Sequence, residues 1–315
     1  MIRFYASEHG QLIELAERRQ SCWINLLPPF GDGELERVAE DLGFPLDFLT
    51  DSLDIDERSR YEREDETRLI LINTPVLNKI DKENEAIYIT APIGIVLTED
   101  HIITISGVEN PIIQRFTEGR VRNFQPESER LFVLQIFEQC TLRFLDCLKK
   151  LNLKRNLIEQ ELYNSSRNSE LKQLLRIEKS LVYFVNTLSA NELLKMKMKR
   201  TDFLKIHEDE ELADLFEDII IDNNQALEMA NVYTNILSGT MEAYASIISN
   251  NLNVFIQRLT VVTIALMVPT LVASFFGMNV KLPFEQADGA FLFILIISVV
   301  IGVALVWFFR RKNLF

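Results

Sequence analysis

Two apolar segments near the carboxyl end of the chain decide its fold. They read LTVVTIALMVPTLVASFFGMNV at residues 259–280 and AFLFILIISVVIGVALVWFF at residues 290–309, and neither contains a charged residue. A helix needs about 20 apolar residues to cross a bilayer, so each segment is long enough to do so. The alternative is a pair of helices buried in a large soluble core, but two such runs at one chain end are unusual in soluble folds. We therefore predict two membrane spans.

The charges that flank the second span predict its orientation. Arg310, Arg311 and Lys312 follow the span, whereas the connecting turn at 281–289 carries one lysine and two acidic residues. Positive charges gather on the cytoplasmic side of membrane helices, so the C-terminus is expected in the cytoplasm. Two spans return the N-terminal part to the same side, and its first residues lack the apolar core of a secretory signal. We expect a cell (inner) membrane protein with both termini in the cytoplasm.

The remainder of the chain is charged and acidic overall. The net charge of −13 disfavours binding to nucleic acid, which needs basic residues, and favours cations as partners. The three cysteines lack C-x-x-C spacing and are expected to be buried free thiols in a reducing compartment. There is no Gly-rich phosphate loop and no nucleophile spacing around His9, His101 and His207. No catalytic residues are predicted, and the chain is not expected to be an enzyme.

The first 125 residues alternate short apolar runs with helical patterns, which is typical of a mixed α/β domain. Strands are expected at residues 2–5, 22–26, 68–77, 87–97 and 102–106. Gly94, inside the fourth of these runs, indicates either a bulge or ordinary strand punctuation.

Long amphipathic helices follow Pro126. The periodicity predicts helices over 128–163 and 170–199, joined by a polar hairpin, and a third from near Glu208 to Phe276. At ~1.5 Å per residue the third helix would be on the order of 100 Å long and would project far into the cytoplasm. Because a helix of that length cannot bury itself, we expect it to pack against parallel copies of itself. This predicts an oligomer without fixing the number of subunits.

The predicted organisation has six parts. They are a cytoplasmic α/β domain (1–125), antiparallel cytoplasmic helices (126–207), a stalk helix continuing as the first span (208–280), an outer loop (281–289), the second span (290–309) and a basic tail (310–315).

A polar stripe follows one face of the first span. Its members recur at spacings of three and four: Asn253, Ile256, Thr260, Thr263, Met267, Thr270 and Ser274. Parallel copies with this face inward would enclose a narrow channel of hydroxyl and amide rings, with apolar constrictions at Ile256, Leu259 and Met267. The other interpretation is helix packing, since serine and threonine are common at membrane helix contacts and can satisfy their own backbone. The stripe alone leaves both interpretations open.

A short motif ends the first span. Gly277-Met278-Asn279 follows two phenylalanines and precedes Pro283. In this position, with Ser238-Gly239, Tyr244, Ser246, Ser249-Asn250 and Asn253 upstream, the motif resembles the signature of the CorA family of magnesium and divalent-cation channels. Trp23-Ile24-Asn25 and the stretch 49–53 with Arg58 and Glu62 extend the resemblance over the whole chain, although Ser59 stands where a proline is common. The resemblance implies a funnel-shaped homopentamer with an α/β/α domain, two antiparallel helices, a stalk that becomes the pore wall, and a second span facing lipid.

The resemblance also implies Mg²⁺ as the transported ion, selected at Gly277, Met278 and Asn279. Mg²⁺ sheds its waters reluctantly, and a ring of Asn279 amide oxygens could accept hydrogen bonds from those waters. Gly277 would allow a backbone conformation closed to other residues, and Met278 would brace the loop against a neighbouring helix.

Two alternatives remain open. A transporter of Zn²⁺, Co²⁺ or Ni²⁺ in the same fold would favour soft or imidazole ligands, of which the stripe has only the thioether of Met267. The other is a non-conducting, membrane-anchored signalling or scaffold protein.

An acidic stalk precedes the first span. Between His207 and Gln257 every charged residue is acidic, so parallel copies would repel unless cations intervene. Acids at a helix start are also favoured by the macrodipole, which is the structural alternative for the first four of them, residues 208–211. By the resemblance, Asp218 holds a regulatory Mg²⁺ together with Asp51 of a neighbouring subunit. Asp222 occupies a second such position, where Thr50 departs from the acidic residue often seen.

Overall fold

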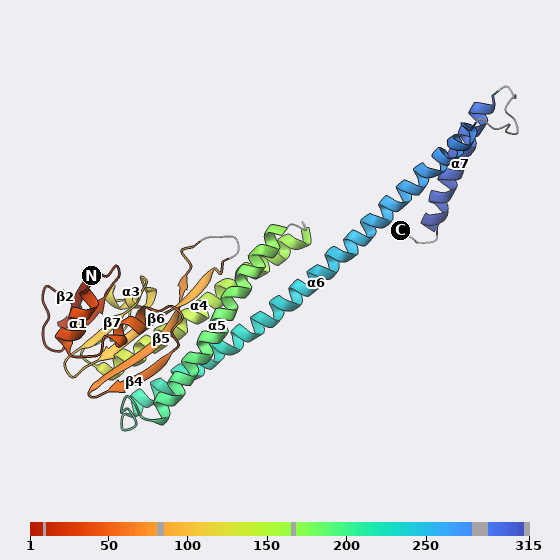
Figure 1. The fold of residues 1–315 in the computed structure, drawn as a ribbon. Helices are drawn as coiled ribbons and strands as arrows, with labels where there is room; N and C mark the ends of the chain where they lie inside the picture. Colours follow the sequence, from red (N-terminus) through yellow and green to blue (C-terminus); the bar gives the residue numbers. More distant parts are fainter. Residues whose placement is uncertain (9–10, 81–84, 165–167, 279–288, 312–315) are drawn as a thin grey trace. The chain divides into compact units, whose positions relative to one another are not determined.

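The structure of the chain is a computed structural model that describes residues 1–8, 11–80, 85–164, 168–278 and 289–311 (Figure 1). It forms two compact units, Met1–Gly239 and Thr240–Phe315. Helix α6 (Glu210–Phe276) runs without interruption through the boundary between them.

A seven-stranded mixed sheet forms the centre of the first unit. Its strand order is β2-β1-β3-β7-β6-β5-β4, and every neighbouring pair is antiparallel except β3 and β7. The strands are β1 (Ile2–Glu8), β2 (Gln11–Leu15), β3 (Trp23–Leu26), β4 (Arg60–Glu64), β5 (Thr67–Leu77), β6 (Tyr88–Leu97) and β7 (Ile102–Ile105). The five expected strands are confirmed. The two that were not expected, β2 and β4, are the edge strands, where little burial is needed and the hydrophobic signal is weak.

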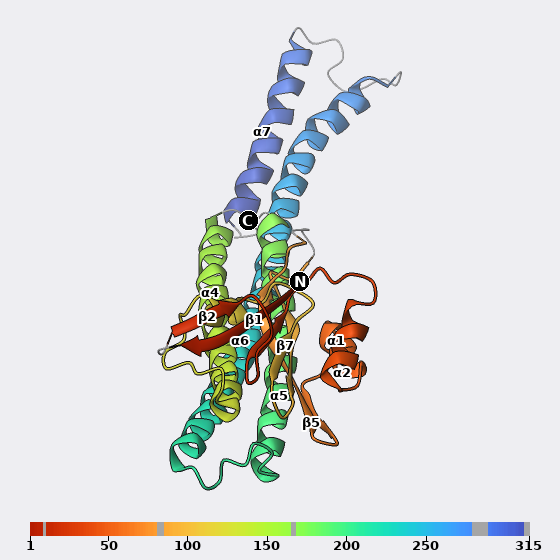
Figure 2. The same cartoon turned by 90° about the vertical axis from the view of Figure 1, so that its left-hand side faces the viewer.

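Helices cover both faces of this sheet, which confirms the α/β/α layering (Figures 1 and 2). Successive side chains of β5 alternate between two cores because strand residues point to opposite faces. Leu69 and Leu71 pack with α1 (Glu34–Leu42) and α2 (Asp47–Thr50). Ile70 and Ile72 pack in the core that contains side chains of α3 (Pro111–Thr117), α4 (Glu129–Asn164), α5 (Asn168–Arg200) and α6. The three long helices thus lie within a few residues of their predicted positions.

Gly94 does not form a bulge. It pairs with Leu71 and Ile105 in an unbroken register, while the short 3₁₀ helix η1 (Asp51–Leu53) crosses directly above it. A Cβ atom at this position would lie 1.9 Å from Ser52 Oγ and 2.9 Å from Ile105 Cγ2. Ser52 is fully buried and donates to the Phe48 carbonyl at 2.6 Å, so it has little room to yield. The absence of a side chain at Gly94 therefore lets η1, the segment that begins with Asp51, pack directly against β6.

We expect Gly94→Ala to lower the thermal unfolding midpoint of the first unit. Forcing a methyl group into this contact costs about 1–3 kcal/mol, which corresponds to roughly 3–10 °C for a unit of this size. Differential scanning calorimetry of the detergent-solubilised protein measures the shift. Gly239→Ala is the matched control, because a Cβ there meets nothing within 4 Å and alanine in a helix is neutral to stabilising. Equal midpoints for the two variants would contradict the close contact at Gly94.

A fully buried lysine joins the three long helices. Lys195 on α5 donates to Thr141 Oγ1 of α4 at 3.1 Å and to Asn223 Oδ1 of α6 at 2.8 Å. The ring of Phe137 lies 5.8 Å from the ammonium nitrogen. Burial away from water lowers the pKa of Lys195 to about 7.

All three cysteines, Cys22, Cys140 and Cys147, are buried free thiols, as predicted. Burial raises the pKa of Cys140 to about 12 and that of Cys147 to about 11, and it also raises the pKa of Cys22. A thiol reacts as its thiolate, so none of these groups is reactive at neutral pH.

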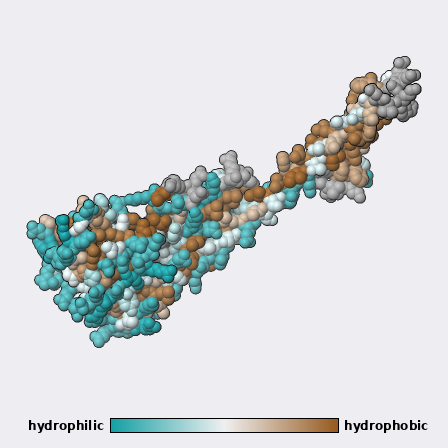
Figure 3. All heavy atoms as spheres, in the orientation of Figure 1, coloured by the Kyte–Doolittle hydropathy of each residue, from teal (hydrophilic) through white to brown (hydrophobic). Residues whose placement is uncertain are grey.

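The second unit consists of the carboxyl part of α6 and helix α7 (Ala290–Arg311). Both helices are long and apolar enough to cross a membrane, and their apolar side chains cover the surface of this unit (Figure 3). Leu266 is 66% exposed and Phe291 is 78% exposed. In the described residues, therefore, neither helix is the buried core helix of a soluble protein, which was the alternative for these two segments.

Candidate ion pathway and cation sites

Helix α7 covers one face of the apolar part of α6. Ala265 and Pro269 of α6 line a shallow cleft with Val299, Gly302 and Val303 of α7. A Cβ atom added to Gly302 would lie 3.5 Å from the Ala265 carbonyl oxygen, so the two backbones approach closely. The half-buried residues of α6 in this region repeat at helical spacing: 261, 264, 265, 268, 269 and 272.

The predicted polar stripe lies on the opposite face of α6. At about 100° per residue, its members are centred on the side of the helix away from the α7 contact. All eight predicted pathway residues are exposed: Asn253, Ile256, Leu259, Thr260, Thr263, Met267, Thr270 and Ser274. A shallow groove of about 430 Å³ runs along this face, between Thr263 and Ser274, with Met267 and Thr270 in its lining. The stripe is thus a continuous surface that α7 leaves uncovered.

Three threonine hydroxyls of the stripe donate to backbone carbonyls one turn earlier. The acceptors are Ile256 for Thr260, Leu259 for Thr263 and Leu266 for Thr270, each at 2.8 Å. This bond satisfies the hydroxyl proton within the helix, as the packing interpretation expected, and leaves the oxygen lone pairs on the exposed face. The bond is therefore compatible with both interpretations of the stripe.

The described part of the signature motif closes the end of α6. The Gly277 amide donates to Ala273 O at 3.0 Å and the Met278 amide to Phe275 O at 3.3 Å. Gly277 has no positive φ, and among the described residues an added Cβ would meet carbonyl oxygens at 3.4 and 3.5 Å. The single chain thus gives no conformational reason for glycine here, contrary to the expectation. Met278 is exposed, and Asn279 lies outside the described residues.

Asp51, the predicted sensor residue of the α/β domain, pairs with an arginine. Its carboxylate lies 2.6 Å from Arg60 Nη2, and both side chains are about one third exposed. Arg60 also pairs with Glu57 at 3.2 Å and with Glu62. Arg60 was not predicted, and the signal in the sequence was a basic residue with Glu57 three positions before it and Glu62 two positions after it.

The acidic residues of α6 divide into two groups. At the helix start, Asp209 accepts from the Leu212 amide at 3.2 Å, as the structural alternative for the first four acids expects, whereas Glu217, two turns further on, pairs with Lys199. Asp218 is exposed and Asp222 is half-buried further along the helix. In the described part of the chain, no group of three or more His, Cys, Asp or Glu side chains is placed to hold a metal ion. One chain alone does not bring Asp51, Asp218 and Asp222 together.

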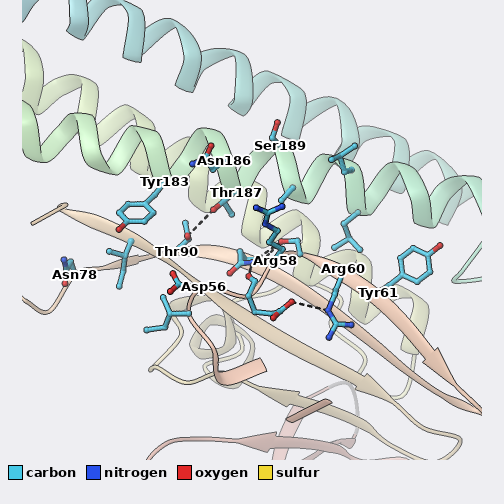
Figure 4. Close-up of a pocket in the computed structure, with 18 of the residues that line it drawn as sticks. Asp56, Arg58, Arg60, Tyr61, Asn78, Thr90, Tyr183, Asn186, Thr187 and Ser189 are labelled. Atoms are coloured by element: carbon cyan, nitrogen blue, oxygen red, sulfur yellow. Dashed lines mark hydrogen bonds and ion pairs between the residues drawn. The ribbon is translucent and has the colours of Figure 1, made fainter. Parts of the chain in front are cut away.

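A cavity of about 1050 Å³ opens between α5 and strands β4 to β6 and was not predicted (Figure 4). Thr187 and Thr90 pair across it at 3.1 Å between their hydroxyl oxygens. Its lining includes Asp56, Arg58 and Arg60, so charges of both signs are present. The cavity adjoins the Asp51–Arg60 ion pair, because Arg60 belongs to both.

The fold and these surfaces define a class of membrane protein, in which an α/β unit is joined by one continuous helix to an apolar two-helix unit with an uncovered polar stripe. Residues 18–311 match the family described as CorA-like Mg²⁺ transporter protein. The chain belongs to that family.

Individual relatives match over nearly the whole chain. The cobalt/magnesium transport protein CorA of Methanocaldococcus jannaschii is 26% identical over 293 residues, covering 92% of this chain and 90% of the relative. The protein of the same description from Thermotoga maritima is 21% identical over 318 residues, covering 98% and 88%. The complete structure of the M. jannaschii CorA magnesium transporter superposes with a TM-score of 0.82 at 24% identity, covering 100% of this chain and 99% of that one. The last comparison shows that the fold is shared.

Proposed function

We propose that this chain is the subunit of a homopentameric channel that conducts hydrated Mg²⁺, selects it at Gly277-Met278-Asn279 and is gated by cytoplasmic Mg²⁺. The observation that carries the proposal is the exposed stripe on the face of α6 opposite α7. In a ring of parallel copies, one face of α6 can surround an axis while α7 lies outside it in contact with lipid. The names of the relatives, cobalt/magnesium transport proteins, support a divalent cation as the substrate.

The residues of the stripe suit an ion that keeps its water. Mg²⁺ dehydrates reluctantly, so oxygen acceptors that hydrogen-bond to its waters are better partners than direct ligands. Asn253 and Asn279 would contribute amide rings at the two ends, with the threonine hydroxyls between them. Ile256, Leu259 and Met267 would form apolar constrictions, which can close a pore by excluding water without moving far.

The acidic residues support regulation by the transported ion. Asp51 of one subunit and Asp218 of its neighbour would share a Mg²⁺ ion that holds the closed state, with Asp222 in a second position. Neither aspartate is buried, so both can be reached by a hydrated cation. Arg60 neutralises Asp51 when no ion is bound.

Thiol labelling tests whether the stripe lines a pore. We expect a membrane-impermeant thiol reagent to modify Thr270→Cys in proteoliposomes and to lower Mg²⁺ influx on the order of tenfold, because a hydrophilic adduct would fill a narrow pathway. Val268→Cys is the matched control, since Val268 is half-buried on the opposite face. The native cysteines are buried and keep their protons, so the background should be low. Equal labelling of both variants, or labelling at 270 without loss of influx, would assign the stripe to packing.

The same proteoliposomes distinguish the alternatives. A transporter for Zn²⁺, Co²⁺ or Ni²⁺ would take up that ion faster than Mg²⁺ from equal external concentrations. A signalling or scaffold protein would give no ion flux above empty vesicles, and Asn279→Ala would have no effect on flux.

A further inference from the structure

The cavity between α5 and strands β4 to β6 has an aromatic end. Tyr183 extends from α5 toward the sheet at this end (Figure 4). Tyr183 is 45% exposed, and in the described part of the chain its ring packs against no other aromatic ring. Ile89 of β6 adds an aliphatic side chain to the same lining. An uncovered tyrosine ring in a cavity provides a stacking surface for a flat group such as a nucleobase.

An amide lies one turn further along α5. Asn186 lines the cavity and is exposed, and among the described residues its side chain makes no hydrogen bond. An amide carries two donor hydrogens and an acceptor oxygen, so it can pair with the edge of any base. The aromatic end thus offers both stacking and hydrogen bonding to a heterocyclic ring.

Hydroxyl groups and a carboxylate line the middle of the cavity. In Figure 4, Asp56 and the pair Thr90–Thr187 lie between Tyr183 and Arg58. The two threonine hydroxyls are 3.1 Å apart, so one donates to the other and the pair retains one proton and free lone pairs. Asp56 is exposed, and its carboxylate is without an ion pair in the described ranges. These groups can accept from and donate to the neighbouring hydroxyls of a sugar.

Unpaired basic residues lie beyond the middle of the cavity. Arg58 and Lys197 both line it and are exposed, and neither cationic group has an ion pair or hydrogen bond among the described residues. Lys197 lies about 21 Å further along α5 than Tyr183, at ~1.5 Å per residue. Arg60 also lines the cavity, but Asp51, Glu57 and Glu62 already pair with it. In a chain with a net charge of −13, two basic groups left unpaired in one cavity favour an anion, and arginine suits phosphate.

We infer that this cavity binds a nucleoside phosphate, with the base at the aromatic end, the sugar at the threonine pair and the phosphates at the two unpaired basic residues. The order of the three kinds of group along the cavity carries the inference. Ligand pockets usually have volumes of about 300–1,000 Å³, so a cavity of about 1050 Å³ is large enough. The chain has no Gly-rich phosphate loop, so side chains hold the phosphates. The inference does not depend on the proposed pore.

Calorimetric titration of the full-length protein in detergent tests this inference. The buffer contains EDTA, so that a nucleotide cannot act by removing Mg²⁺ from the protein. We expect ATP and UTP both to bind, because tyrosine stacks on either base and an amide can pair with either. Adenosine and inorganic tripolyphosphate should each bind at least about tenfold more weakly than ATP, because each contacts only one end of the cavity.

Two substitutions should divide the ligand between the two ends. Arg58→Gln removes a charge-assisted contact and Tyr183→Ala removes the stacking surface, so each should weaken ATP binding about tenfold. Only Arg58→Gln should weaken the binding of tripolyphosphate, and only Tyr183→Ala should weaken that of adenosine. Both side chains are exposed, so the thermal unfolding midpoints of the variants should match that of the parent.

Arg63→Gln and Val182→Ala are the matched controls. Arg63 is an exposed arginine of β4 and Val182 precedes Tyr183 on α5, and neither lines the cavity. Both controls should bind ATP as the parent does. No heat of binding with ATP or UTP, or an ATP affinity unchanged in both Arg58→Gln and Tyr183→Ala, would overturn the inference. Tripolyphosphate that binds as tightly as ATP would also overturn it, because the cavity would then recognise the anion alone.

Discussion

Replacing Asp51 and Asp218 together by asparagine is expected to leave Mg²⁺ influx insensitive to Mg²⁺ inside proteoliposomes, whereas the parent protein is inhibited. Two carboxylates about 4 Å apart near a protein surface repel by about 4 kcal/mol, and a divalent cation between them reverses the sign of that interaction. Asparagine retains the side-chain shape but removes the charges that the ion would bridge. The measurement is initial influx as a function of internal Mg²⁺ concentration.

Asp214→Asn is the control for this prediction. Asp214 is an exposed acidic residue one turn before Asp218 on α6, so it tests whether any loss of stalk charge is sufficient. Inhibition that persists in the double variant would reject the sensor assignment. Limited proteolysis provides a second readout, because Mg²⁺ should protect the parent protein and fail to protect the double variant.

Removing the arginine that pairs with Asp51 should have the opposite effect and make inhibition by internal Mg²⁺ more sensitive. Arg60 competes with a cation for Asp51, and exposed pairs of this kind contribute up to about 1 kcal/mol. Arg60→Gln should therefore lower the Mg²⁺ concentration for half-maximal inhibition by roughly two- to fivefold. Arg63→Gln removes the nearby pair with Glu66 and should not change it.

The second large effect is expected in the pH dependence of stability. Lys195 has a pKa of about 7 when folded and an ordinary value near 10.5 when unfolded. Between these values the unfolded chain binds more protons, so the free energy of unfolding rises with pH. The slope approaches 1.4 kcal/mol per pH unit, or about 2–3 kcal/mol between pH 7 and 9. As the pH approaches 9 and beyond, Cys140 and Cys147 oppose the rise, because folding raises their pKa from 9 to about 12 and about 11.

Lys195→Met should remove most of this rise. The thermal unfolding midpoint of the parent protein should increase by roughly 4–12 °C between pH 7 and 9, while that of the variant stays nearly flat. Lys197→Met on the same helix is the control, because Lys197 is exposed. A parent midpoint that falls over this range, or the same rise in Lys195→Met, would show that Lys195 does not lose its proton in the folded state.

Much of the fold could be predicted because it depends on periodic patterns. The central strands and the long helices are continuous apolar or amphipathic runs, and their bounds differ from the predicted ones by a few residues. The edge strands β2 and β4 were missed because they bury little. The reason for Gly94 could not be predicted, since it depends on η1, a segment more than 40 residues earlier in the chain, lying against the strand.

The candidate site could likewise be predicted only in part from the sequence. The face of α6 opposite α7 follows from helical spacing alone, so the stripe residues could be named from the sequence. Partners brought together by tertiary folding could not, which is why Arg60 beside Asp51 and Lys195 beside Asn223 were missed. The direction of the threonine protons also requires coordinates, because spacing does not reveal which carbonyl a hydroxyl selects.

The contact of Gly302 with Ala265 bears on how the two spans enter a bilayer. Pro269 has no N–H, so the Ala265 carbonyl lacks its usual donor four residues later, and an unpaired carbonyl in hydrocarbon is costly. The backbone of α7 at Gly302 lies close to this oxygen, since a Cβ there would be 3.5 Å from it, and so helps to shield it. The first span is therefore poorly suited to stand alone in lipid, and we expect the two spans to be released from the insertion machinery as a pair.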